Sequence, residues 1–224
     1  MIDDWGYSLN NIDILQEIDR PVTLAILPHL RYSQEISEMA RKHGDKYDVI
    51  LHLPLESKSG KAQEQDTIRR NMKKERVLSI LNDDIGGVSG IIGVSNHQGS
   101  KATENKDTMK IILEELKKRK LFFLDSRTTP VSVCGDISGK IGLRHAERDV
   151  FLDLVQKKEE RQYRDYIKKQ IKNLIAIARI KGSAIAIGHD KKLTLEVIKE
   201  SIPDIEKENI KIVPLKILMR RHGK

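Results

Sequence analysis

The sequence has 224 residues, 38% of them hydrophobic and 33% charged, so it is long enough to bury a core without crosslinks. Lys and Arg exceed Asp and Glu by 41 to 33, a net charge of +8, but the charge is spread over helix faces without aromatic or RNA-binding signatures and does not indicate a nucleic-acid partner. The single cysteine, Cys134, excludes an internal disulfide, and no apolar run reaches the ~18 residues of a membrane span.

Apolar β-rich runs alternate with amphipathic helical patterns along the whole chain. Strands are predicted at residues 1–4, 21–27, 47–53, 90–95, 121–124, 183–187 and 210–213. Helices are predicted between them, at residues 10–18, 33–43, 73–84, 105–120, 131–140, 160–180 and 193–202. This alternation predicts one parallel α/β domain over residues 1–224, either a barrel or a doubly wound sheet. The lack of a Gly-rich phosphate loop after any strand disfavours a nucleotide-binding sheet.

The first predicted strand starts at Met1 and has the pattern of a strand whose beginning is missing. We therefore expect the chain to be cut from a longer precursor, so that a lost export signal leaves no trace here.

Polar residues with metal-binding or acid–base chemistry fall at the carboxyl ends of the predicted strands. They are Asp3, Asp4, His29, His52, Asn96, His97, Asp125 and His189. In a parallel barrel or sheet these ends share one face, so residues distant in sequence converge there. The coincidence of Asp4, His52, His97 and His189 is typical of a catalytic zinc site, and Co²⁺ or Ni²⁺ would accept the same ligands. Taken alone, His29 and His145 are interpreted as ordinary packing residues.

Seven segments, in order along the chain, resemble the divergent polysaccharide deacetylase family, of the NodB-like deacetylase superfamily. They are Ile2–Tyr7, Val22–His29, Leu51–Glu56, Ser95–Ser100, Phe122–Thr129, Arg148–Asp153 and Ala184–His189. The resemblance implies an irregular (β/α) barrel of about seven parallel strands. It also implies hydrolysis of N- or O-acetyl groups on an acetylated polysaccharide or oligosaccharide.

The resemblance also implies roles for particular residues. One divalent metal ion, zinc above all, would be held by Asp4, His52 and His97. Asp3 would be the general base and His189 the general acid. Asp125 and Arg127 would orient or polarise these groups.

The sequence departs from the superfamily where two ligand histidines normally follow one strand in the pattern HxxxH. Here Glu56 stands four residues after His52, and the second imidazole is drawn from His97 on another strand. Glu56 could be a substitute ligand, a substrate contact or a polar loop residue. Glu56 and Asn96 are the candidate substrate-binding residues. Superfamily kinship further implies export to the cell envelope.

Three other functions stay open at this stage. An inactive carbohydrate- or metal-binding protein on the same scaffold is favoured by the missing HxxxH. Asp3 and His189 count against it, because a binding protein needs neither a base nor an acid. A different metallohydrolase would need a denser cluster of ligands, and nucleic-acid binding rests on net charge alone.

Overall fold

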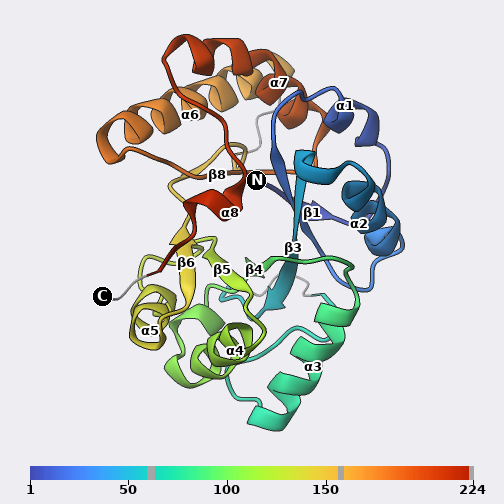
Figure 1. The fold of residues 1–224 in the computed structure, drawn as a ribbon, viewed down its shortest axis with the longest axis vertical. Coiled ribbons are helices and arrows are strands. Elements are labelled where there is room, and N and C mark those ends of the chain that lie inside the picture. Colours follow the sequence, from blue (N-terminus) through green and yellow to red (C-terminus); the bar gives the residue numbers. More distant parts are fainter. Residues whose placement is uncertain (60–63, 156–158, 222–224) are drawn as a thin grey trace.

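The computed structural model describes residues 1–59, 64–155 and 159–221. Its sheet has the strand order β7-β8-β1-β2-β3-β4-β5-β6-β9, in which every pair is parallel except β6 with β9. The strands are β1 (Ile2–Trp5), β2 (Val22–Ile26), β3 (Tyr47–Leu55), β4 (Gly93–Gln98), β5 (Phe122–Asp125), β6 (Arg144–Glu147), β7 (Val150–Phe151), β8 (Ala186–His189) and β9 (Arg220–Arg221). The eight parallel strands curl into a half-barrel, which confirms the predicted α/β barrel (Figure 1).

Helices surround the sheet (Figure 1). They are α1 (Ile12–Gln16), α2 (Ser33–Lys42), α3 (Lys74–Gly86), α4 (Lys106–Lys118), α5 (Cys134–Ile141), α6 (Glu160–Lys181), α7 (Lys192–Lys207) and α8 (Leu215–Leu218), with 3₁₀ turns at Gly44–Lys46 and Ala102–Glu104. Local chemistry sets several ends: the Asn105 side chain accepts from the Thr108 N–H at the start of α4. Gly142 and Gly182 take the left-handed conformation that ends α5 and α6. Of the described helices, none has the length and apolar character needed to cross a membrane.

The two faces of the sheet bury different apolar clusters, because successive side chains of a strand point to opposite faces. On β3, Leu51 and Leu53 belong to the large cluster shared with the covering helices, whereas Ile50 packs with Phe122 and Leu124 inside the curled sheet. The residues that alternate with Leu51 and Leu53 therefore face the interior. His52 continues that inner face beyond Ile50, toward the carboxyl end of the strand.

The structure corrects part of the predicted element list. Residues 210–213 are not a strand; Ile210 and Ile212 are partly buried and pack against the core from an irregular segment. Strands β6 and β7 were not predicted, because β6 is polar and β7 spans two residues. Helix α7 also continues through Pro203 to Lys207, five residues past its predicted end.

Candidate metal centre and acid–base site

A bulge in β1 brings two consecutive carboxylates to one site. Ile2 pairs with Leu24 and Trp5 with Ile26, so β1 has one more residue than β2 over this stretch. The extra residue is accommodated at Asp4, whose φ of 66° lies in the left-handed region that Asp tolerates better than most residues. In a regular strand Asp3 and Asp4 would point to opposite faces. Here both approach His52.

Asp4, His52 and His97 form the predicted metal-binding group. Oδ1 of Asp4 lies 3.1 Å from Nδ1 of His97 and 3.4 Å from Nε2 of His52, and one donor atom from each residue lies within 4.8 Å of the others. Tetrahedral zinc with bonds of about 2.0–2.1 Å separates its ligand atoms by about 3.3–3.4 Å. Two imidazole nitrogens and a carboxylate at this spacing fit a divalent ion of the zinc type.

Neighbouring strands orient the first imidazole. His52 and Ser95 are paired across β3 and β4, and Nδ1 of His52 lies 2.8 Å from Oγ of Ser95. That contact leaves Nε2 of His52 directed at the two aspartates. A partner on the second ring nitrogen is the usual means by which proteins fix the orientation of a metal-binding histidine.

The charge state of Asp4 suits a ligand. Burial alone would raise the pKa of Asp4, but hydrogen bonds and charge interactions with His52 and His97 outweigh burial and hold that pKa well below its usual range. Asp4 is therefore a carboxylate at any physiological pH, as metal binding requires.

Asp3 has the environment of a base. Its side chain is 3% exposed, and Oδ1 makes no hydrogen bond to any residue that the structure describes. Burial raises the pKa of Asp3, although the nearby His52 and His189 act in the opposite direction. A carboxylate with a higher pKa accepts a proton more readily, and no described residue competes for Oδ1.

His189, at the end of β8, is paired with a buried aspartate. Its Nδ1 lies 2.6 Å from Oδ1 of Asp153, while Oδ2 of Asp153 accepts from the His189 N–H and the Thr194 hydroxyl. Burial lowers the pKa of His189, but the hydrogen bond and the charge of Asp153 outweigh burial and raise it. Asp153 thus favours the protonated form of His189, which is the form that a general acid needs. Asp153 was not predicted as a site residue, although it ends the family-like segment Arg148–Asp153.

Phe151 and Arg148 complete this side of the site and were also not predicted. The Phe151 ring is stacked on the His189 ring with centroids 6.0 Å apart, and the Arg148 guanidinium lies 3.7 Å from the Phe151 centroid. Arg148 also donates to the carbonyl oxygens of Ser126 and Arg127. These contacts anchor Arg148 against Phe151, beside the His189 ring.

Asp125 and Arg127 lie near the site without contacting its reactive atoms directly. Asp125 is fully buried and accepts from the Arg127 N–H and the Ser132 hydroxyl. The Arg127 guanidinium is directed at Glu147 and the Pro130 carbonyl. The charge of Arg148 interacts with Asp125 and, more weakly, with Asp3.

The two predicted substrate contacts are engaged within the protein. Asn96 is 1% exposed; its Oδ1 accepts from the Ser126 N–H and its Nδ2 donates to the Gln98 carbonyl. It alternates with His97 and so shares the face of Val94, away from the interior. Glu56 pairs with Lys101 at 2.7 Å and accepts from the Arg70 N–H, so its carboxylate fastens loops and is not among the metal-binding group.

Comparison with known proteins identifies the family of the chain. Residues 1–219 match the family of divergent polysaccharide deacetylases. An uncharacterized protein of Haemophilus influenzae is 32% identical over 220 residues, which are 98% of this chain and 75% of that protein. A solved structure of an uncharacterized protein from Agrobacterium tumefaciens superposes with a TM-score of 0.88 at 22% identity, covering 97% of this chain and 87% of that one.

A more distant fold likeness is the structure of a CE4 family pseudoenzyme from Bacillus anthracis. Its TM-score is 0.50 at 13% identity, covering 98% of this chain and 63% of that one. The family match covers the segments that carry Asp4, His52 and His97, which the structure brings together. The chain belongs to the divergent polysaccharide deacetylase family.

Proposed function

We propose that this protein is a metal-dependent hydrolase that removes acetyl groups from a carbohydrate polymer. The observation that carries the proposal is the arrangement around Asp4, His52 and His97. The candidate base is Asp3, whose Oδ2 lies 3.5 Å from Nε2 of His52. The candidate acid is His189, which ends β8, the strand paired with β1, and is hydrogen-bonded to Asp153. A binding site alone would need the metal donors but not a base and an acid beside them.

Each group has one task in the reaction. A divalent ion bound to Asp4, His52 and His97 supplies Lewis-acid chemistry, polarising the acetyl carbonyl and easing the deprotonation of water. Asp3 accepts the proton of the water whose oxygen forms the new bond to the acetyl carbon. His189 donates its proton to the sugar nitrogen or oxygen as the bond to the acetyl carbon breaks. The products are acetate and the free amine or hydroxyl.

The finer identity of the partners follows from the same proposal. Zinc is the first candidate for the ion, with Co²⁺ or Ni²⁺ as alternatives, because imidazole and carboxylate donors suit all three. The substrate is an acetylated polysaccharide or oligosaccharide. We propose that the reaction takes place at the cell envelope.

A second candidate is a carbohydrate- or metal-binding protein that performs no reaction. The specific observation in its favour is Glu56, which stands where the superfamily has its second ligand histidine and is paired with Lys101 instead. The fold is also shared with the B. anthracis pseudoenzyme. Retention of both Asp3 and the Asp153–His189 pair favours the hydrolase.

The first test is the zinc content of the purified protein by elemental analysis, with His52→Ala, His97→Ala and Asp4→Asn variants alongside. Asn is chosen at position 4 because it tolerates the left-handed backbone. Each variant should bind one zinc ion per chain fewer than the wild type, and acetate release from acetylated chito-oligosaccharides or acetylated xylan should disappear with the ion. Equal zinc content in all four proteins would refute the metal site. Zinc loss without any deacetylation by the wild type would favour the binding protein.

A further inference from the structure

A second group of metal-binding side chains lies outside the Asp4 site and shares no residue with it. His29 lies in the loop between β2 and α2, and Asp83 and Asp84 belong to the last turn of α3. Nε2 of His29 is 3.2 Å from Oδ2 of Asp83 and 3.3 Å from Oδ1 of Asp84, and the three donor atoms lie within 4.8 Å of one another. These separations match those at Asp4, and they suit the ligand shell of a zinc-type ion.

The buried carboxylate of Asp84 has one oxygen atom that no described residue hydrogen-bonds. Its side chain is 2% exposed, and Oδ2 forms no hydrogen bond within the described part of the chain. Both aspartates also stand at the carboxyl end of α3, the negative end of the helix dipole, and the last turn has no basic residue. Burial raises the pKa of Asp84 to about 7, and the charges of Asp83 and Asp66 act in the same direction. A buried carboxylate in this setting is costly unless a cation binds it.

The backbone is shaped to seat the His29 ring. A Cβ atom at position 87 would lie 2.9 Å from Cε1 and 3.2 Å from Nδ1 of that ring, so the imidazole occupies space that only a glycine leaves open. His29 itself has a φ of 58°. The imidazole is thereby held with Nε2 toward the two carboxylates.

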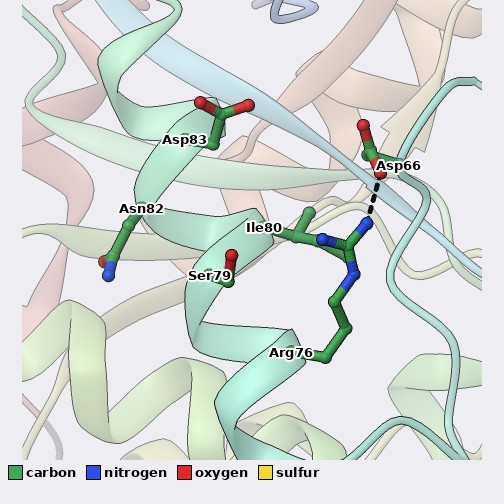
Figure 2. Close-up of a pocket in the computed structure, with 6 residues that line it drawn as sticks. All are labelled: Asp66, Arg76, Ser79, Ile80, Asn82 and Asp83. Atoms are coloured by element: carbon green, nitrogen blue, oxygen red, sulfur yellow. Dashed lines mark hydrogen bonds and ion pairs between the residues drawn. The ribbon is translucent and has the colours of Figure 1, made fainter.

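Of these three residues, Asp83 also lines an open hollow on the surface. A pocket of about 580 Å³ is lined by Asp83 together with Arg76, Ser79, Ile80 and Asn82 of the same helix and by Asp66 (Figure 2). Arg76 is neutralised by its ion pair with Asp66 at 2.6 Å, drawn as a dashed line in Figure 2. An ion can therefore reach Asp83 from the surface and keep water on its open side.

We propose that His29, Asp83 and Asp84 bind a second divalent cation of the Zn²⁺ class, independently of the Asp4 site. One imidazole nitrogen, two carboxylates and a water molecule make a four-ligand shell of the kind zinc accepts. The ion ties the loop after β2 to the end of α3 and compensates the buried charge of Asp84. Its role is therefore to stabilise the fold, and it does not depend on the deacetylase activity.

The test measures zinc binding by calorimetry in a His97→Ala background, which disables the Asp4 site. This protein should still bind one zinc ion per chain, and zinc should raise its melting temperature. Adding His29→Ala or Asp84→Asn should abolish both effects, whereas adding Glu75→Gln, on the exposed first turn of α3, should change neither. Gly87→Ala, which alters no ligand, should weaken zinc binding at least tenfold by displacing the imidazole.

Asp84→Asn separates loss of the ligand from loss of the fold. Because it removes an uncompensated buried charge, it should not lower the melting temperature of metal-free protein. The second site would be refuted if the His97→Ala protein bound no zinc. It would also be refuted if adding His29→Ala or Asp84→Asn to His97→Ala left zinc binding unchanged. Either result would leave the Asp4 site, and the proposed deacetylation, to its own test.

Discussion

Replacing Asp153 by Asn tests the general acid directly. Asp153 is fully buried, and its carboxylate accepts the 2.6 Å hydrogen bond from Nδ1 of His189. Because the pKa of His189 is raised by Asp153 against the effect of burial, the imidazolium persists to higher pH than in an ordinary histidine. Catalysis that needs this proton is present below the raised pKa and is lost as pH rises through it. Without the charge of Asp153, burial dominates and the loss moves to lower pH.

The magnitude follows from the type of hydrogen bond. A hydrogen bond to a charged group contributes about 1.5–3 kcal/mol, a factor of about 10–160 in an equilibrium constant. We therefore expect kcat of Asp153→Asn to fall about 10–160-fold near neutral pH, with a smaller deficit in acid. The assay is acetate release against pH, accompanied by zinc content to show that the metal site is intact.

Thr194→Val is the matched control. It removes the 2.8 Å hydrogen bond from the Thr194 hydroxyl to Oδ2 of Asp153 but leaves the carboxylate charge beside His189. This variant should keep the alkaline limb of the pH profile close to that of the wild type. If Asp153→Asn retained the wild-type profile and kcat, the assignment of His189 as the acid would be wrong. The same holds if Thr194→Val shifted the limb as far as Asp153→Asn.

Three further predictions address other parts of the site. The Asp3→Asn variant should keep its zinc, because Asp3 is not among the metal-binding group. Its kcat should fall by about 10²–10⁴, the usual effect of losing a general base. Unchanged turnover would contradict the role of Asp3. Ser95→Ala should weaken zinc binding about 10–100-fold by freeing Nδ1 of His52, whereas Ser138→Ala, a buried serine of α5, should leave the affinity unchanged. The Phe151→Leu variant should have a free energy of unfolding lower by about 1–2 kcal/mol, because the contact between Arg148 and the aromatic ring is lost. Denaturant titration measures this change. An unchanged unfolding midpoint would contradict a stabilising contact between Arg148 and Phe151.

Long periodic elements were predictable from the sequence, and short or polar ones were not. The helix predicted at 33–43 is observed at Ser33–Lys42, because its apolar stripe is complete. By contrast, β6 has a single buried residue, His145, and no apolar run to reveal it. The segment 210–213 alternates like a strand because Ile210 and Ile212 are partly buried. The alternation of apolar and polar residues in this segment therefore indicated burial and not strand pairing.

The candidate site was also only partly predictable from the sequence. Strand ends identified Asp4, His52 and His97, since parallel strands bring their carboxyl ends together. Which face a residue takes depends on register, and this separates His97 from Asn96 although they are adjacent. The bulge that turns Asp4 toward His52 leaves no pattern in the sequence. The role of Asp153 was hidden because it acts through His189, 36 residues later.

The strand order has a consequence for how the protein is made. The three residues proposed to bind the metal lie within the first 97 residues, on β1, β3 and β4, whereas His189 ends β8 and its partner Asp153 follows β7. The two groups join only when β8 pairs with β1, where Asp3 meets His189 across 186 positions of the chain. Closing so long a loop is slow compared with local pairing. If the proposed function holds, a nascent chain can therefore assemble its metal-binding group before the proposed general acid is in place, and activity should appear later in folding than metal binding.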